Sequence, residues 1–103
     1  MSLRVVVHPE ALRELGDAIE WYDQGQQGRG TRFRADYDGI IDRCLQWPRS
    51  AAVVLVPGSE RIFRHARVPR SHYRVVYYIR HEVFKVVAIA HERRLPLYWA
   101  PRR

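Results

Sequence analysis

Two stretches in the first half of the chain carry apolar residues at helical spacing. The first spans residues 10–23, and its apolar positions are Leu12, Leu15, Ile19 and Tyr22. The second spans about residues 31–47, and its apolar stripe consists of Phe33, Tyr37, Ile40, Ile41 and Cys44. The glycine-rich segment QGQQGRG separates them, and Pro48 ends the second. The pattern predicts two helices in an antiparallel hairpin, with Glu14, Asp17 and Glu20 on the solvated side of the first.

The second half of the chain alternates β-branched and aromatic runs with turn residues. Its predicted strands are AAVVLV, RIFRHARV, HYRVVYYIR and VFKVVAIAH, and a further run, LRVVVH, precedes the first helix. Strands joined by such short turns predict an antiparallel meander. The expected fold class is therefore α+β, with an N-terminal strand and a two-helix hairpin packed on one face of a twisted antiparallel sheet. We expect one domain over residues 1–103.

The last two strands can be aligned if His81 and Glu82 form a two-residue turn, so that Arg80 pairs with Val83. The cross-strand pairs on one face are then Tyr78/Lys85, Val76/Val87, Arg74/Ile89 and His72/His91. The opposite face receives Tyr73, Val75, Tyr77 and Ile79 against Phe84, Val86, Ala88 and Ala90. Because the second set is apolar, we expect it beneath the helices. The first set, with its arginine and histidines, is expected on the less covered face, where it either binds a partner or is simply solvated.

The charge of the chain is strongly positive. The formal net charge is +7 with a sequence pI of about 10.3, and Lys85 is the only lysine among 18 lysine and arginine residues. Arginine binds phosphate and carboxylate groups in a bidentate manner, so the composition indicates an anionic partner. That partner could be a nucleic acid or an acidic protein segment, and the composition does not separate the two.

Other classes of protein have little support in the sequence. No apolar run approaches the roughly 18 residues that a membrane helix needs, and the lone Cys44 has no internal disulfide partner, so we expect a cytoplasmic protein. His72 and His91 lack a third ligand at metal-binding spacing, so neither a metal nor another cofactor is expected. The chain has no glycine-rich phosphate loop and no Ser-His-Asp signature.

Four segments together resemble the RelE/ParE toxin superfamily of bacterial type II toxin–antitoxin systems. They are HPEALRELGDAIEWYDQ, the WP that follows the second helix, YRVVYYI and HERRLPLYW, and the resemblance covers nearly the whole chain. It implies a small basic toxin that a cognate antitoxin wraps and neutralises in a hetero-oligomer. The fold that it implies is the helical hairpin on an antiparallel sheet.

The resemblance implies two alternative activities. In the RelE-like branch the toxin cleaves messenger RNA on the ribosome, and the matching residues here are Arg74, Arg93 or Arg94, and Tyr98, with His91 as acid or base. RelE places lysines in its middle strand, whereas this chain has Arg61, Arg64, His65 and Arg67 there. Arginine is a poor base, so His65, His72 or His91 would have to serve.

In the ParE-like branch the toxin poisons DNA gyrase by protein contact. The segments AIEWY and HERRLPLYW are closer to ParE and plasmid-stabilisation proteins, so we favour this branch. The residues expected to bind the target or a nucleic acid are Arg61, Arg64, Arg67, His72, Arg74, Arg93 and Arg94. A plain nucleic-acid-binding module is a third reading, but it needs exposed aromatic platforms, and most aromatic residues here are assigned to the core.

The last residues are too apolar for a free tail. Leu95, Leu97 and Trp99 are apolar, and Pro96 and Pro101 stiffen this segment in an extended form. We therefore expect residues 95–99 to dock on the domain. This docking would hold Arg93 and Arg94 at the rim of the face that carries Arg74 and His91.

Overall fold

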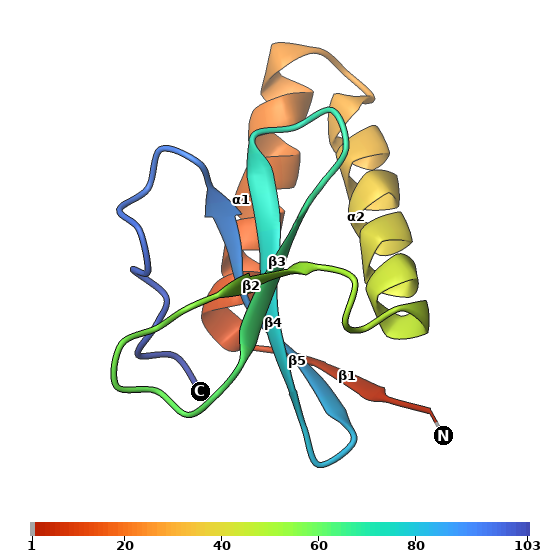
Figure 1. The fold of residues 1–103 in the computed structure, drawn as a ribbon. Coiled ribbons are helices and arrows are strands. Elements are labelled where there is room, and N and C mark those ends of the chain that lie inside the picture. The colour runs from red at the N-terminus through yellow and green to blue at the C-terminus, as the bar shows by residue number, and fades with distance from the viewer. Residues whose placement is uncertain (1) are drawn as a thin grey trace.

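The computed structural model describes residues 2–103 as two layers with an additional C-terminal segment (Figure 1). The elements in chain order are β1 (Arg4–Val7), α1 (Pro9–Gly25), α2 (Arg29–Gln46), β2 (Ala52–Val54), β3 (Phe63–Arg67), β4 (Tyr73–Arg80) and β5 (Val83–His91). The strands form a five-stranded sheet in the order β1-β5-β4-β3-β2. None of the helices in residues 2–103 is long and apolar enough to span a bilayer. The expected α+β fold is confirmed.

The sheet is mixed rather than fully antiparallel. Strands β2 to β5 form the expected antiparallel meander. Strand β1, in contrast, pairs in parallel with β5, from Arg4 opposite Val83 to Val7 opposite Val86. The parallel pairing is possible because the helical hairpin and the meander separate β1 from β5 in the chain.

Helix α1 is capped at its N-terminus. There the His8 Nδ1 atom accepts a hydrogen bond of 3.0 Å from the Glu10 N–H.

The two helices are held together at the turn between them. The Gly30 N–H donates a hydrogen bond to Asp23 Oδ1 at 2.7 Å. A Cβ atom on Gly30 would lie 2.5 Å from the Ile19 carbonyl oxygen, so only glycine allows the helices to approach this closely here.

One face of the sheet, here called the helix face, packs against both helices. Its buried residues from α2 are Phe33, Tyr37, Ile41 and Cys44, as the stripe predicts. From α1 they are Ala11, Leu15, Ala18 and Tyr22, with Glu14 on the same side. The prediction was wrong for Leu12, which is 58% exposed, and for Glu14, which is 7% exposed. The buried stripe includes Ala11 and Ala18, which were not among the apolar positions used for the prediction. The buried face of α1 is therefore centred on the alanines and not on Leu12.

The predicted register of β4 and β5 is confirmed near the turn and wrong beyond it. Arg80 pairs with Val83 and Tyr78 with Lys85, although His81 and Glu82 both adopt positive φ, 51° and 63°. Between Tyr77 and Val76 the ladder then shifts by one residue, as in a β-bulge. The observed pairs beyond this point are Val76/Ala88, Val75/Ile89, Arg74/Ala90 and Tyr73/His91.

The bulge exchanges the faces of β5 residues. Ile89 joins the core beneath the helices, where we had expected Ala88 and Ala90. Those two alanines pack instead on the opposite face. The predicted cross-strand pairs Arg74/Ile89 and His72/His91 are therefore wrong, because a single extra residue reverses the alternation of every side chain after it. The rings of His72 and His91 nevertheless lie near each other, with 6.0 Å between their centroids.

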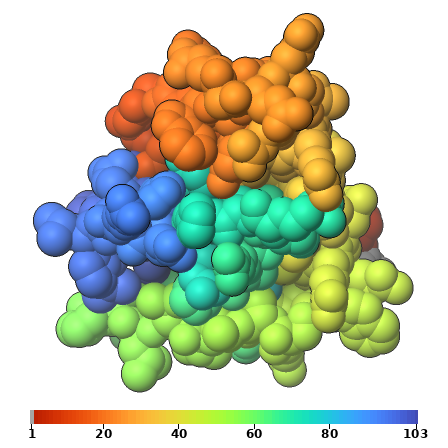
Figure 2. Space-filling model, turned by 90° about the horizontal axis from the view of Figure 1, so that it is seen from above, coloured from red at the N-terminus to blue at the C-terminus, as the bar shows by residue number. Residues whose placement is uncertain are grey.

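The opposite face, here called the tail face, is covered in its middle by residues 92–103, the C-terminal arm. Its buried cluster consists of Phe63, Val76, Tyr78, Val87, Ala88 and Trp99. Trp99 is 4% exposed and its ring centroid lies 4.9 Å from that of Phe63, so the predicted docking of the arm is confirmed there. Leu95, expected to dock as well, is 79% exposed. In Figure 2 the arm (blue) lies against both α1 (orange) and the strands (teal).

Candidate functional site

A basic cluster lies on the tail face where β3 and β4 are paired. Arg67 is directly opposite Arg74, and His65 is opposite Val76 on the same face. The Arg67 Nε–H donates to the Ser71 carbonyl oxygen at 2.9 Å, which fixes its side chain near the β3–β4 connection. We call His65, Arg67 and Arg74 the basic cluster.

The electrostatics of the cluster favour a neutral histidine. Burial lowers the pKa of His65, and the Arg74 guanidinium lowers it further. Both effects disfavour a second positive charge next to Arg74. The cluster therefore presents an uncharged imidazole beside two guanidinium groups, an arrangement that suits an anionic partner.

The C-terminal arm is fixed by the buried carboxylate of Glu14. The Tyr98 hydroxyl donates to Glu14 Oε2 at 2.7 Å. Arg102 forms a bidentate pair, with Nη1 2.8 Å from Oε1 and Nη2 3.1 Å from Oε2. The side chains of Glu14 and Arg102 are 8% and 14% exposed. This is a charge-assisted network shielded from solvent, which makes each bond stronger than a surface pair.

The same network completes the edge of β5. Strand β1 pairs with β5 only as far as Val86, so the next backbone groups of β5 lack a neighbouring strand on that side. The Ile89 N–H donates to Glu14 Oε1 at 3.1 Å, and the Val87 carbonyl oxygen accepts from Arg102 Nη1 at 3.0 Å. Two side chains thus replace a strand, and the buried backbone groups keep their hydrogen bonds.

Two of the residues proposed for RNA cleavage belong to this network. Burial and the hydrogen bond to Glu14 raise the pKa of Tyr98 well above its ordinary value. The Arg94 guanidinium lies 3.9 Å from the centroid of the Tyr98 ring and 3.9 Å from Glu14 Oε2. Tyr98 and Arg94 therefore contact Glu14 of α1 and each other rather than a residue of the basic cluster.

The two predicted histidines His72 and His91 lie close together but contact other groups than the basic cluster. His91 packs edge-on against Tyr73 at 5.0 Å between ring centroids, and its Nδ1 accepts from the Arg93 N–H at 3.1 Å. His72 lies 2.9 Å from Glu92 through its Nδ1. Since Tyr73 packs with the helix-face core, His91 does not share a face with Arg74, and that part of the prediction was wrong. Arg93 is exposed.

The remaining predicted arginines lie at the other end of β3. The Arg64 Nη1 donates to the carbonyl oxygens of Arg49 and Ala51 at 3.1 and 2.8 Å. Arg64 pairs with Tyr77 of the helix-face core, so it faces away from the basic cluster. Arg61 covers the Tyr78 ring at 4.7 Å on the tail face.

Sequence reasoning missed Glu14 and Arg102 as structural residues. Glu14 was assigned to the solvated side together with Asp17 and Glu20, the other acidic residues of the same helix. Its position between Ala11 and Ala18, one turn from each on the buried stripe, was the available signal. Arg102 had no comparable signal, since its partner is 88 positions away.

No metal site and no reactive thiol occur among residues 2–103. No group of three or more potential ligands is arranged to hold a metal ion in this part of the chain. Burial raises the pKa of the Cys44 thiol, so little thiolate is present at neutral pH. Cys44 is a core residue, as expected.

The comparison with family models identifies the fold's relatives. Residues 5–96 match the model described as ParE toxin of type II toxin-antitoxin system, parDE. The match runs from β1 past the end of β5, while Tyr98 and Arg102 lie beyond it. No curated protein matches the chain. Since the family match spans both helices and the whole sheet, the chain belongs to the ParE toxin family: it is the toxin of a type II toxin–antitoxin pair, and its partner is an antitoxin.

Proposed function

We propose that this toxin inhibits DNA gyrase by protein contact rather than by cleaving RNA. The observation that carries the proposal is the placement of Tyr98. Its hydroxyl is committed to the buried Glu14 carboxylate, and its pKa is raised, so it is a poor proton donor or acceptor for a substrate. Arg94 likewise contacts Tyr98 and Glu14, and His91 packs against Tyr73, whose side chain lies on the other face of β4 from that of Arg74.

The tail face supplies a surface for the target. The basic cluster lies on this face, and Arg93 follows the end of β5 as a further exposed positive charge. An acidic protein surface would pair with these groups without any bond being broken, and its approach would be accelerated by the net charge of +7. A gyrase target places the action of the toxin in the cytoplasm.

The second candidate function is ribosome-dependent cleavage of messenger RNA. One observation favours it. His65 lies on the same face as the paired residues Arg67 and Arg74, and burial together with Arg74 lowers the pKa of His65. A neutral imidazole could accept the proton of a ribose 2′-hydroxyl while Arg67 and Arg74 stabilise the phosphate. Within residues 2–103 no ion pair joins a carboxylate to His65, Arg67 or Arg74, so we rank this function second.

A paired assay separates the two functions. Purified toxin is incubated with gyrase and supercoiled DNA, and separately with translating ribosomes and a defined message. We expect gyrase inhibition and intact message. Cleavage of the message within ribosome-bound codons, with gyrase unaffected, would contradict the proposal and establish the second function.

The variants His65→Ala and Arg74→Ala sharpen the assay. Loss of a general base would reduce cleavage by about 100-fold or more for His65→Ala. If the cluster only binds a protein, Arg74→Ala weakens the gyrase effect while His65→Ala changes it far less. Melting temperatures of both variants provide the control for folding.

A further inference from the structure

We infer that a cavity between the C-terminal arm and the β2–β3 connection binds a small molecule that carries a diphosphate group. Three arginines, Arg61, Arg80 and Arg103, line it, and we call it the arginine cavity. Binding there does not depend on whether the target of the toxin is gyrase or the ribosome.

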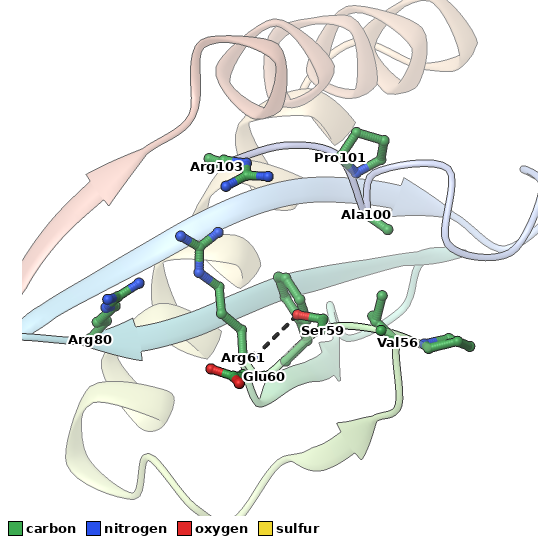
Figure 3. A pocket seen from close by; sticks show the side chains of 11 residues that line it. Val56, Ser59, Glu60, Arg61, Arg80, Ala100, Pro101 and Arg103 are labelled. Carbon is green, nitrogen blue, oxygen red and sulfur yellow. Dashed lines mark hydrogen bonds between the residues drawn. The ribbon is translucent and has the colours of Figure 1, made fainter.

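The arginine cavity is large enough for a small molecule. Its volume is about 480 Å³, within the range of roughly 300–1,000 Å³ that is usual for such sites. It is lined by residues 56–61 of the β2–β3 connection, by Phe63 and Arg80 of the sheet, and by Ala100, Pro101 and Arg103 of the arm. Figure 3 shows the three arginines around the same hollow. A ligand in this cavity would therefore contact the connection, the sheet and the arm together.

The lining of the arginine cavity is positively charged. None of the three arginines forms an ion pair within residues 2–103. Glu60 is the one acidic residue that lines the cavity, so the lining keeps an excess of two positive charges. Guanidinium groups without a protein carboxylate keep their capacity to bind phosphate in a bidentate manner. The charge therefore predicts an anionic ligand.

The Arg61 guanidinium is positioned before any ligand binds. It lies 4.7 Å from the centroid of the Tyr78 ring, a cation–π contact. The backbone on which it stands is also ordered, because the Arg61 N–H donates to Ser59 Oγ at 3.1 Å and the Ser59 N–H donates to the Val56 carbonyl oxygen at 3.1 Å. A side chain that is already positioned loses less conformational entropy on binding than a free one.

The arm is fixed on the other side of the cavity. Trp99 packs against Phe63, whose ring centroid lies 4.9 Å away and which also lines the cavity. Arg102, the neighbour of Arg103 in the chain, is bound to the Glu14 carboxylate. The docked arm thus brings Arg103 to the cavity. A ligand that contacts Arg103 together with Arg61 would add a link between the arm and the β2–β3 connection.

The lining suits a compact ligand with more than one anionic group. Because the three arginines come from three separate segments, a single carboxylate cannot reach all of them, whereas two adjacent phosphates present several acceptor oxygens in a small volume. Val56, Pro57 and Pro101 add apolar surface to the lining, against which an organic group such as a nucleoside can pack. A nucleoside diphosphate and inorganic pyrophosphate share the chemistry that the arginines recognise.

A single-stranded nucleic acid fits the cavity less well. Such a strand binds through exposed aromatic side chains on which its bases stack. The aromatic residues at this cavity are Phe63, which is 1% exposed, and Tyr78, which is 9% exposed and covered by Arg61. The phosphate groups of a small molecule therefore match the lining better than a run of stacked bases.

Calorimetric titration of the full chain with ADP, and separately with inorganic pyrophosphate, tests the site. We expect at least one of them to bind with a Kd of about 100 µM or less, from two or more charge-assisted hydrogen bonds. Tighter binding of ADP would identify a nucleotide as the ligand, and equal or tighter binding of pyrophosphate would identify an inorganic phosphate chain. Both results support the site. Binding of neither would overturn the inference, as would tighter binding of a single-stranded oligonucleotide than of ADP.

Variants of the lining separate a specific site from general attraction to a basic protein. Arg61→Gln and Arg80→Gln should each raise Kd by about 10-fold or more, because each removes a charge-assisted hydrogen bond. Arg43→Gln, at an exposed position of α2, removes the same charge elsewhere and is the matched control. It should change Kd by less than about threefold, since distant exposed charges are screened by salt.

Glu60→Gln should act in the opposite direction. It removes the one negative charge of the lining, so it should lower Kd, whereas Glu20→Gln, at an exposed position of α1, should leave Kd nearly unchanged. Melting temperatures measured without ligand show that each variant is folded. Equal changes of Kd in the cavity variants and in their controls would overturn the inference, because the net charge of +7 alone would then account for binding.

The link to the arm gives a readout that is independent of toxicity. A ligand that binds only the folded state raises the melting temperature. We expect the better of the two ligands to raise the melting temperature of the parent, and to raise that of Arg103→Gln by less at the same concentration. An equal rise in both proteins would show that the ligand does not contact the arm and would contradict the inferred site.

Discussion

The two faces of the sheet are closed in different ways. The helix face is covered by two long helices, and its core combines Tyr77 and Phe84, stacked at 4.2 Å, with residues from both. The tail face is covered by a short arm whose main apolar anchor is Trp99. The arm is held to α1 by one buried carboxylate, Glu14. The helix face therefore depends on many apolar contacts, whereas the tail face depends on a few specific ones and should be opened by single substitutions.

The largest effect should come from removing the apolar anchor of the arm. Trp99→Ala should lower the free energy of unfolding by about 3–5 kcal/mol, because it leaves a cavity against Phe63. The measurement is chemical denaturation of parent and variant. Trp47→Ala is the matched control, since Trp47 is 60% exposed and its loss should change stability by about 0.5 kcal/mol or less. Equal effects in the two variants would show that the arm is not packed.

The next effect concerns the carboxylate that holds the arm. Glu14→Gln should lower the free energy of unfolding by about 3 kcal/mol, because Arg102 is left buried without a counter-charge. Glu20→Gln, on the exposed side of the same helix, is the control and should have little effect. Chemical denaturation of the parent and both variants should report the loss. A variant as stable as the parent would mean that the network contributes nothing to closing the tail face.

An alkaline titration compares the two faces in one experiment. Burial raises the pKa of Tyr77 on the helix face and of Tyr98 in the arm. A group whose pKa is raised by folding stabilises the protein below its unfolded pKa, here about 10, and this contribution is lost as the pH rises further. We expect stability to fall above about pH 10. The fall in stability should be less steep for Tyr98→Phe than for the parent. The difference between the two measures how much Tyr98 of the arm contributes to the pH dependence.

The smallest effect concerns the basic cluster. His65 should titrate below 6.5, because burial and Arg74 both lower its pKa. Arg74→Ala should raise that pKa without restoring the ordinary value, since burial is the larger cause. Histidine resonances followed by NMR across the titration provide the measurement. An unchanged pKa in the variant would place Arg74 too far from His65 to act with it.

Much of the helix face could be predicted from the sequence because it follows regular periods. The stripe of α2 and the turn that pairs Arg80 with Val83 were both correct. On α1 the same reasoning failed for Leu12, because small alanines rather than the largest apolar residue define the side that approaches β5.

The tail face could be predicted only in part, for two physical reasons. The bulge beside Tyr77 has no composition signal, because Val87 and Ala88 are both apolar and either could occupy the buried side. The link between Glu14 and Arg102 joins residues that are distant in the chain, and no spacing rule connects them. The docking of Trp99, in contrast, followed from its apolar character alone.

We propose that Tyr98 closes the tail face and does not take part in a chemical step. Tyr98→Phe, measured for melting temperature and for growth arrest on induction without antitoxin, tests this most directly. We expect a lower melting temperature, from the lost hydrogen bond to Glu14, and growth arrest that persists at temperatures where the variant is folded. A variant that melts like the parent but no longer arrests growth would contradict the proposal and make Tyr98 a catalytic residue.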